Sequence, residues 1–344
     1  MTYIIGEVGQ NHNGSIDAAK NLIKSASREV YEPLFNLKLN PINAVKFTKR
    51  DLNYEMSSTM MNQPYLNKNS FGKTYKEHRN FLELSFEDHL ELYKYSKSLN
   101  LDFIETLCSI SCLEILDFFK PDFIKIASRD LTNIPLVEEI AKTNIPMIIS
   151  TGMAGKKELD DALEKINIYH NDVSILHCVS EYPTHPRNVN LKSINFLQKN
   201  YKNNLIGYSD HTIGISVPIS AVSMGAAIIE KHITLDRNMK GTDHKGSLGP
   251  EGLQRMVRDL RLLEMSLGKE DIFIDESAVN AKVKLARSLS SNKKLEQGHL
   301  ISENDFHLLS PGDGISWKDR KLLIGKKIKK SINKNETIYL KNTI

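Results

Sequence analysis

Eight short apolar runs, separated by longer amphipathic segments, recur through the first two thirds of the chain and constrain its fold more than any other feature. They begin at residues 2, 43, 102, 123, 147, 173, 205 and 226, with sequences such as TYIIGEV, FIKIAS and AAIIEKHI. Strands this apolar are expected to be buried on both faces, which is typical of parallel sheets covered by helices. Eight β/α units over about 265 residues predict an α/β protein built on a (β/α)8, or TIM, barrel. An open doubly wound sheet is the alternative, although the glycine-rich phosphate loop of that fold is missing.

The domain organisation follows from where this pattern stops. We expect three parts: a barrel at residues 1–268, a charged linker at residues 269–284, and a small, mainly β module at residues 285–344. Within the barrel, the apolar periodicity predicts amphipathic helices at residues 85–100 and 252–268. Residues 49–82 are too polar and too long for a minimal loop. They predict an excursion over the barrel mouth with a short helix of its own.

Composition and charge exclude several classes of function. The chain has 46 basic and 42 acidic side chains, a net charge of +4, whereas a dedicated nucleic-acid binder would carry a stronger basic excess. The first residues do not resemble a signal peptide, and no apolar run reaches the roughly 20 residues that a membrane helix needs. Three cysteines without CxxC spacing fit free thiols in a reducing compartment. We therefore expect a cytoplasmic protein that binds neither nucleic acid nor a membrane.

Polar residues stand at the carboxyl ends of most of the apolar runs. The set is Glu7, Lys46, Thr48, Glu105, Thr106, Lys125, Ser128, Ser150, Thr151, Ser180, Glu181, Ser209, His211, Glu230 and His232. Active sites of (β/α)8 barrels lie at these strand ends. So many polar side chains on otherwise apolar strands predict the lining of one pocket.

Two histidines end the seventh and eighth predicted strands, which are neighbours in a barrel. The neutral imidazoles of His211 and His232 could share one divalent cation completed by water or substrate, or each could hydrogen-bond within the core. Nitrogen ligands favour Mn, Co or Zn over Ca. Asp243 and His244 follow in a loop that we place on the same face of the barrel.

Two lysines lie inside apolar strands, where a charged side chain must reach solvent or meet an anion. Lys46 and Lys125 in one barrel mouth predict a site for phosphate or carboxylate. Structural pairing with Glu7 and Glu105 is the alternative, and Glu7 could instead act as a general base. The residues alone therefore predict a barrel with an anion site beside a metal site, and they do not specify a reaction.

Seven motifs resemble the sialic acid synthase family in sequence and in order. They are EVGQNHNGSIDAAKNLI, VKFTKRDL, FIKIASRDLTNIPL, IISTGM, LHCVSEYP, IGYSDHTIGI and IEKHITLDRNMKGTDHKGSLGPEGL. The C-terminal module resembles the antifreeze-like (SAF) domain of the same family. This resemblance implies a transferase that condenses phosphoenolpyruvate with N-acetylmannosamine or a related open-chain sugar, giving a nonulosonic acid and inorganic phosphate.

The resemblance also implies roles for individual residues. Positions that surround phosphoenolpyruvate in the family are matched by Lys46, Thr106, Lys125, Ser128, Ser150 and Ser209. His211 and His232 match the ligands of a divalent metal, with Mn first and Mg or Co as alternatives. Glu7 and Asp243 match acidic residues near the acceptor sugar, and Glu7 is the first candidate for proton transfer. Tyr182 matches an aromatic residue beside the same sugar.

Four positions depart from the usual pattern of the family. Thr48 replaces an amide, Cys108 replaces an aromatic residue, and Ser180 stands at an asparagine position. Asp130 is one methylene shorter than the usual glutamate and is preceded by Arg129. Thr48, Asp130 and Ser180 are still expected to bind substrate, so these departures leave the identity of the acceptor sugar open.

The acceptor is open between a free sugar and its 6-phosphate. Residues 63–85 resemble the animal-type 9-phosphate synthases, and Lys68, Lys73, Lys76 and Arg79 could bind a sugar phosphate. We favour the free sugar because most bacterial members of the family use one, and synthesis of legionaminic or pseudaminic acid is a further alternative. A metal-dependent barrel hydrolase and a non-enzymatic carbohydrate-binding protein are the remote alternatives.

The resemblance implies a domain-swapped homodimer. In the family, the C-terminal domain of one subunit caps the barrel of its partner and presents an arginine before Pro-Gly. Here Ser310 stands at that position, and His307 and Lys318 are the candidate replacements.

Overall fold

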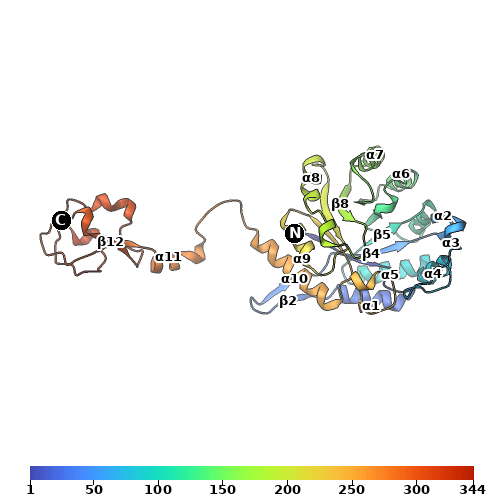
Figure 1. Ribbon diagram of the computed structural model, residues 1–344, viewed down its shortest axis with the longest axis horizontal. Helices are drawn as coiled ribbons and strands as arrows, with labels where there is room; N and C mark the ends of the chain where they lie inside the picture. Colours follow the sequence, from blue (N-terminus) through green and yellow to red (C-terminus); the bar gives the residue numbers. More distant parts are fainter. The chain divides into compact units, whose positions relative to one another are not determined.

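The computed structural model describes residues 1–344 and divides into two units, Met1–Gly268 and Lys269–Ile344. The first unit is a closed barrel of eight parallel strands with helices around it (Figure 1). The strands are β1 (Tyr3–Gly9), β4 (Ala44–Lys49), β5 (Asp102–Leu107), β6 (Phe123–Ile126), β7 (Met147–Gly152), β8 (Val173–Val179), β9 (Leu205–Asp210) and β10 (Ile228–His232). Their order around the barrel is β1-β10-β9-β8-β7-β6-β5-β4. The predicted barrel is confirmed, and the open-sheet alternative is wrong.

Seven α-helices surround the strands. They are α1 (Ile16–Ala26), α5 (Phe86–Ser98), α6 (Ile134–Lys142), α7 (Lys156–Asn167), α8 (Lys192–Asn200), α9 (Ser216–Ser223) and α10 (Pro250–Ser266). Helices α5 and α10 occupy the two predicted helical segments. The start of α5 is fixed by a capping box, in which Ser85 and Asp88 each accept a hydrogen bond from the other's backbone N–H. After β5, the 3-10 helix η1 (Ile110–Asp117) replaces a regular α-helix.

Alternation along the strands separates the floor of the barrel from its mouth. The inner layer is a cluster of buried apolar side chains: Ile5, Ala44, Ile104, Ile148, Leu176 and Ile228. Side chains two positions further along a strand point to the same face. The next inward positions are Glu7, Lys46, Thr106, Ser150, Cys178 and Glu230. The apolar layer therefore closes the barrel directly beneath a polar layer at the carboxyl ends of the strands.

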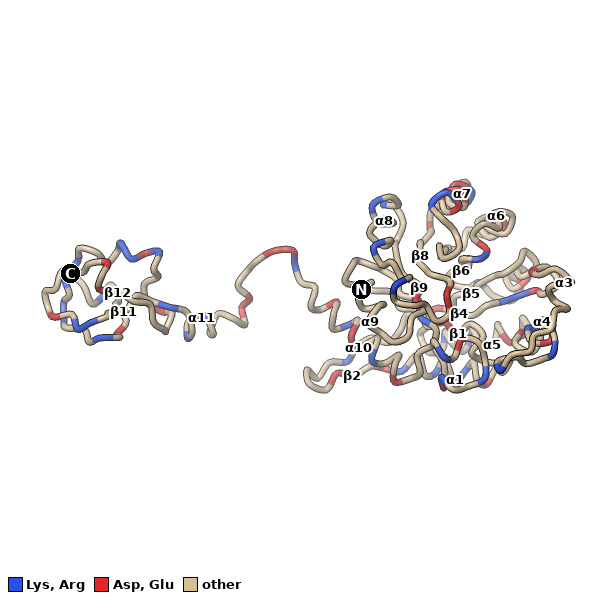
Figure 2. The backbone as a smooth tube through the Cα atoms, viewed as in Figure 1, with Lys and Arg blue, Asp and Glu red and all other residues tan.

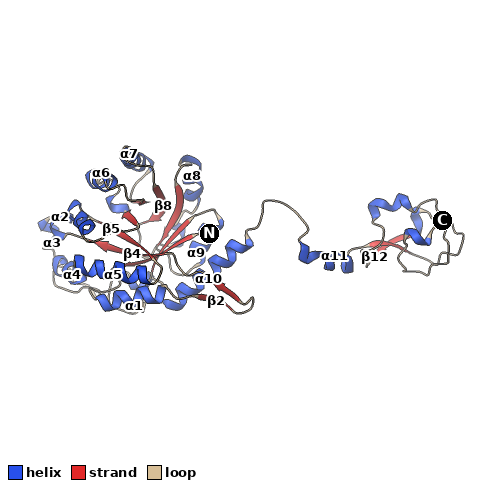
Figure 3. Cartoon of the chain, turned by 180° about the vertical axis from the view of Figure 1, so that it is seen from behind, coloured by secondary structure: helices blue, strands red, loops and turns tan.

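The excursion between β4 and β5 contains three short helices rather than the one that we expected. They are α2 (Leu52–Glu55), α3 (Ser58–Met61) and α4 (Tyr75–Leu82) (Figure 3). A capping box between Thr74 and Glu77 fixes the start of α4. A small antiparallel hairpin, β2 (Val30–Glu32) with β3 (Leu37–Leu39), was not expected from the sequence.

The second unit is a small module with its own core. Strands β11 (Ser288–Ser291) and β12 (Phe306–Leu309) form an antiparallel pair, and isolated bridges extend the β structure. Its buried apolar residues are Leu289, Leu295, Ile301, Phe306, Leu323, Ile328, Ile332 and Ile338. The 3-10 helices are η6 (Glu303–Asp305), η7 (Trp317–Leu322) and η8 (Leu340–Asn342). The mainly β character expected of this module is thus observed.

The predicted linker is acidic at its start and helical at its end. Acidic side chains cluster between residues 270 and 276, as the red segments of Figure 2 show. The 3-10 helix η5 (Glu276–Ala278) and helix α11 (Val279–Leu285) follow, so the last part of the predicted linker has regular structure. Across the whole chain, no helix combines the length and the apolar character required to span a bilayer.

Candidate functional site

A cavity of about 550 Å³ opens at the carboxyl ends of the barrel strands. Twelve of the predicted site residues line it: Glu7, Lys46, Thr48, Thr106, Lys125, Ser128, Ser150, Tyr182, Ser209, His211, His232 and Asp243. These residues reach the cavity because each of them lies on the inward face near the end of a strand or in the loop that follows the strand. The structure therefore brings together residues that span more than 230 positions of the sequence.

The floor of the cavity contains the two predicted lysines in different surroundings. Lys46 Nζ lies 2.8 Å from Glu7 Oε2 and 3.8 Å from Glu230 Oε2, and it donates a hydrogen bond of 3.0 Å to Thr106 Oγ1. Lys125 Nζ donates to Ser150 Oγ at 2.6 Å and to the carbonyl of Ile126 at 3.1 Å.

The floor therefore holds one lysine with carboxylate partners and one without. No carboxylate forms an ion pair with Lys125, although its ammonium group is almost completely buried. A buried cation without a counterion is a position prepared for an anion.

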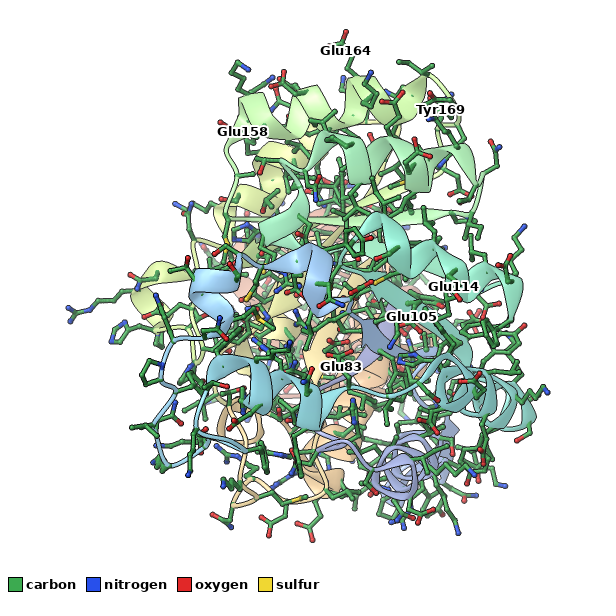
Figure 4. The ribbon with its side chains drawn as sticks, turned by 90° about the vertical axis from the view of Figure 1, so that its right-hand side faces the viewer. Glu83, Glu105, Glu114, Glu158, Glu164 and Tyr169 are labelled. Atoms are coloured by element: carbon green, nitrogen blue, oxygen red, sulfur yellow. The ribbon has the colours of Figure 1, made fainter.

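The predicted pairing of a lysine with Glu105 is wrong. Glu105 is adjacent in sequence to the inward-facing Thr106 and therefore points to the opposite face of β5. Its Oε2 lies 2.9 Å from Nδ1 of His89 on the surrounding helix α5. Figure 4, which views the barrel from the side of α2 to α4, labels Glu105. Thr151 and Glu181 were also expected in the pocket and do not line it.

Two buried carboxyl groups flank Lys46 and differ in their pKa values. Burial raises the pKa of Glu7, against the opposing charge of Lys46. Burial would also raise the pKa of Glu230, but the ammonium groups of Lys46 and Lys125 outweigh it and lower that pKa. Ser209 Oγ donates a hydrogen bond of 2.8 Å to Glu230 Oε1 and adds to the same effect. Glu7 is thus poised to exchange a proton, whereas Glu230 stays ionised.

The two histidines lie side by side at the ends of β9 and β10. The ring centroids of His211 and His232 are 5.3 Å apart, and the ring of Tyr182 lies 4.0 Å from that of His211. Nδ1 of His211 lies 2.8 Å from the carbonyl oxygen of Val179. Because a carbonyl oxygen only accepts hydrogen bonds, Nδ1 carries the proton and Nε2 of the neutral ring has a free lone pair. Burial lowers the pKa of His211 to about 4, so its imidazole is neutral.

These residues fit a divalent cation as an incomplete ligand set. Nδ1 of His232 is buried and has no hydrogen-bond partner, which the core-histidine alternative does not explain. Oδ2 of Asp243 lies 3.8 Å from it, too far for a hydrogen bond. No group of three or more His, Cys, Asp or Glu side chains is arranged around a common metal position. The protein would therefore supply two imidazoles, and water or substrate would supply the other ligands.

Two predicted substrate-binding residues and one predicted loop residue lie outside the cavity lining. Asp130 Oδ2 accepts a hydrogen bond of 3.1 Å from Arg129 Nε, and Ser180 Oγ lies 2.8 Å from Ser128 Oγ. Each therefore contacts a lining residue instead of the cavity itself. His244 is fully buried, with Nδ1 lying 2.7 Å from Thr234 Oγ1, and it supports the loop instead of facing the cavity.

Several lining residues were missed or given no role by the sequence analysis. They are Glu230, Arg50, Arg129, Gln10, Asn69, Met153 and Thr242. Glu230 was expected to line the pocket but was given no role; it stands two positions before His232 on the same strand and so faces the same way. The excursion contributes Arg50, Asn69 and Arg79, and no local pattern indicates which of its polar residues turn inward. Lys68, Lys73 and Lys76 are exposed and do not line the cavity.

In the second unit, Ser310 is exposed and contacts an arginine that the sequence analysis did not consider. Nη1 of Arg287 donates a hydrogen bond of 3.2 Å to Ser310 Oγ, which itself donates to the carbonyl of Leu285. His307 Nε2 is buried without a partner. Arg287 therefore joins His307 and Lys318 as a candidate for the role of the missing arginine.

A comparison with known families adds the relationship that geometry alone does not give. Residues 39–271 match the NeuB family, and residues 286–342 match the SAF domain. The chain belongs to the NeuB family. Its relatives are nonulosonic acid synthases, which are transferases that form a C–C bond from phosphoenolpyruvate and an amino sugar substrate. The chain is a transferase of this class, which sets aside the hydrolase and the non-enzymatic alternatives.

Similarity to individual relatives extends over nearly the whole chain. N-acetylneuraminate-9-phosphate synthase of Homo sapiens is 34% identical over 340 residues, covering 98% of this chain and 91% of the relative. N,N'-diacetyllegionaminic acid synthase of Legionella pneumophila is 33% identical over 342 residues, covering 98% and 93%. The crystal structure of the N-acetylneuraminic acid synthetase from Leptospira borgpetersenii superimposes with a TM-score of 0.67 at 30% identity, covering 81% of this chain and 90% of that one. Since these relatives make different products, their names leave the acceptor of this chain unresolved.

Proposed function

We propose that this protein condenses phosphoenolpyruvate with an open-chain N-acylated mannosamine or a closely related sugar and releases inorganic phosphate. The observation that carries the proposal is Lys125, a buried cation without a carboxylate partner, on the floor of the cavity next to Lys46. Phosphoenolpyruvate, a multiply charged anion, would supply the counterion that Lys125 lacks. The hydroxyl groups of Thr106, Ser128, Ser150 and Ser209 line the same cavity and would complete the hydrogen bonds of the donor.

In this proposal, Lys46 and Lys125 balance the charge of phosphoenolpyruvate, which the carboxylates of Glu7 and Glu230 would otherwise repel. When C3 of the donor attacks the aldehyde of the sugar, positive character develops at C2, and water adds there before phosphate departs. Glu7 is the residue we assign to take the proton from that water, because burial brings its pKa toward neutral pH. Asp243, whose Oδ2 lies 3.8 Å from Nδ1 of His232, is the second candidate.

His211 and His232 would hold a divalent cation, with Mn first and Mg or Co as alternatives. When bound, such an ion supplies Lewis-acid polarisation of the acceptor carbonyl. Tyr182, whose ring lies 4.0 Å from that of His211, would limit the access of solvent to the same position.

The finer choices belong to the proposal as well. We favour a free sugar as acceptor over a 6-phosphorylated one, with N-acetylneuraminic acid as the product and legionaminic or pseudaminic acid as the alternative products. A cytoplasmic location is supported by three cysteines that are all free and buried. A domain-swapped homodimer is supported by the separate, compact C-terminal unit on an acidic connecting segment.

Phosphate release tests the reaction directly. The full chain is incubated with phosphoenolpyruvate, Mn and a panel of acylated mannosamines and their 6-phosphates. We expect phosphate release that depends on one of these sugars, together with a nonulosonic acid or its 9-phosphate as the second product. Lack of release with every sugar, from folded protein loaded with metal, would show that the assigned reaction is wrong.

Two further experiments test the metal and the dimer. Chelation should abolish turnover, Mn should restore it, and His211→Ala should lose the Mn binding that electron paramagnetic resonance detects in the intact protein.

For the dimer, a chain ending near residue 280 should be folded but nearly inactive. Mixing it with full-length His211→Ala should partly restore turnover, because only the mixed dimer pairs an intact barrel with an intact cap. Full activity of the truncated chain alone would contradict the cap.

A further inference from the structure

Three loops meet at the side of the barrel mouth that carries Asp243. They are the loop after β1, the excursion after β4 and the loop after β10, and they are neighbours because β1 pairs with both β4 and β10. Each contributes to the cavity lining: Gln10 from the first, Asn69 and Arg79 from the second, and Thr242 and Asp243 from the third. The relative positions of the three loops therefore set the shape of the cavity on this side.

A closed ring of contacts joins the three loops, and we call its members, Asn13, Gly14, Phe71, Phe81 and Lys240, the rim brace. Nδ2 of Asn13 donates a hydrogen bond of 3.0 Å to the carbonyl of Lys240. Nζ of Lys240 lies over the ring of Phe71, 4.9 Å from its centroid. Phe71 stacks on Phe81 with centroids 4.4 Å apart. The carbonyl of Phe81 packs against Gly14, the neighbour of Asn13, and so completes the ring.

Most of the rim brace is rigid. Gly14 has a φ of +71°, and a Cβ at this position would lie 2.1 Å from the carbonyl oxygen of Phe81, so only glycine allows this close approach. Phe71 is held from a second side by His78, whose Nδ1 accepts a hydrogen bond of 3.2 Å from the Phe71 N–H and whose ring stacks at 5.8 Å. Phe71 thus presents a fixed ring face, whereas the side chain of Lys240 is exposed and is the movable member.

The two sides of Asp243 in the chain are held unequally. On the C-terminal side, Ser247 Oγ donates a hydrogen bond of 2.7 Å to the carbonyl of Asp243 and accepts one of 2.9 Å from Asn11 Nδ2, and both partners are buried. On the N-terminal side, residues 236–242 are exposed or half-buried. Within this stretch, Lys240 contacts both neighbouring loops. The position of Asp243 therefore depends on the rim brace from one side and on buried hydrogen bonds from the other.

Building on the proposed function, we propose that Lys240 is a positioning residue for Asp243. Its ammonium group on the face of Phe71 closes the rim brace and holds the Asp243 carboxylate beside the histidine pair, where Oδ2 lies 3.8 Å from His232 Nδ1. The proposed function places the carbonyl of the acceptor sugar at that pair. Lys240 does not line the cavity itself, so it acts through Asp243 and not on the substrate.

Kinetics of the full-length, Mn-loaded protein test the assignment, with phosphoenolpyruvate and the acylated mannosamine that supports phosphate release. Lys240→Met removes the charge and keeps the length of the side chain. We expect kcat/KM for the sugar to fall about two- to fivefold, the size of a cation–π contact at an exposed position, and the KM for phosphoenolpyruvate to stay unchanged. Lys240→Arg should restore the wild-type value, because it keeps a cation over the ring. The exposed Lys245→Met on the same loop is the matched control. Equal changes for both substrates, or none for either, would overturn the assignment.

Double variants show whether the effect passes through the named partners. Lys240→Met combined with Phe71→Leu should lower kcat/KM for the sugar no further than the larger of the two single substitutions, since both break the same contact. Lys240→Met should likewise add nothing to Asp243→Asn, because the carboxylate that it positions is then absent. Full additivity in either pair would show that Lys240 acts independently of that partner and would overturn the assignment.

Hydrogen exchange separates this assignment from the proposed reaction, because it needs no turnover. Backbone amides of residues 236–248 should exchange at least about twofold faster in Lys240→Met and in Phe71→Leu than in the wild-type protein and Lys245→Met, while amides of β10 stay unchanged. Faster exchange without phosphate release from any sugar would retain the rim brace and overturn only the proposed reaction. Unchanged exchange of this segment would overturn the positioning role, whatever reaction the protein performs.

Discussion

Two buried lysines on the barrel strands have opposite surroundings. Lys231 on β10 is 1% exposed and points away from the barrel axis, and its Nζ lies 2.6 Å from Asp210 Oδ2. The carbonyl of Thr212 accepts a further hydrogen bond from it, and Tyr208 OH donates to the other oxygen of Asp210 at 2.9 Å. Lys125 on β6 is 2% exposed and points into the mouth, where its partners are a hydroxyl group and a carbonyl.

This contrast separates a structural charge from a functional one more clearly than burial does. Burial lowers the pKa of both lysines, so both ammonium groups carry a desolvation cost. At Lys231 the adjacent Asp210 offsets that cost within the folded protein. At Lys125 no neighbouring carboxylate forms an ion pair, so the more distant charges of Glu230 and Glu7 offset that cost less directly and a bound anion would offset more of it. A buried cation that lacks its counterion is therefore the better indicator of a ligand site.

The largest expected effect is on stability at the outward pair. Lys231→Ala should lower the free energy of unfolding by about 3–5 kcal/mol, because it leaves the buried Asp210 carboxylate without its cation. Urea denaturation followed by circular dichroism measures the change, with the exposed Lys76→Ala as control. A loss below about 1 kcal/mol would mean that the pair is not a structural unit.

The inward lysine should show its effect in binding. Lys125→Ala should weaken phosphoenolpyruvate binding by about 1.5–3 kcal/mol, roughly ten- to a hundredfold, since one charge-assisted contact to the donor is lost. The affinity for the acceptor sugar should change far less. Titration calorimetry with phosphoenolpyruvate gives the number, and an unchanged affinity would place Lys125 with the structural charges.

Removing the charge of Lys125 should change the free energy of unfolding only slightly, or raise it. Lys125→Met replaces an unpaired buried charge with an apolar chain of similar length, so the free energy of unfolding without ligand should fall by less than about 1 kcal/mol or rise. Parallel denaturation of this variant and Lys231→Ala sharpens the comparison. Equal losses in the two variants would contradict the distinction between the sites.

The smallest expected effect is a dependence of stability on alkaline pH. The pKa of Lys125 is lower in the folded protein than in the unfolded chain, so over the interval between the two values the unfolded chain binds more protons. Stability contributed by this group therefore rises with pH as the folded value is passed. Relative to Lys125→Met, the wild-type protein should gain unfolding free energy as the pH rises toward the usual lysine pKa of about 10.4. Parallel stability curves for the two proteins would contradict this shift.

Most of the site could be predicted because it depends on strand ends. A polar residue on the inward face near the end of an apolar run reaches the mouth whenever the parallel strands form a barrel, and Lys46, Lys125, His211 and His232 all follow this rule. Asp130 and Ser180 fall outside it, since they turn toward Arg129 and Ser128 instead of the cavity. Residues contributed by the excursion, such as Arg79, carry no periodic signal at all.

The sequence by itself determined the eight strands, their parallel order and the set of polar residues gathered at their carboxyl ends, because hydrophobic periodicity acts locally along each segment. Only the tertiary structure decided which face of each strand looks inward. Parallel barrel strands are buried on both faces, so the apolar neighbours of Lys125 and Lys231 give no contrast between the cavity and the helix layer. Likewise, the contact of Glu55 with Arg129 joins residues far apart in the chain, and it exists because barrel closure brings the end of α2 against the end of β6.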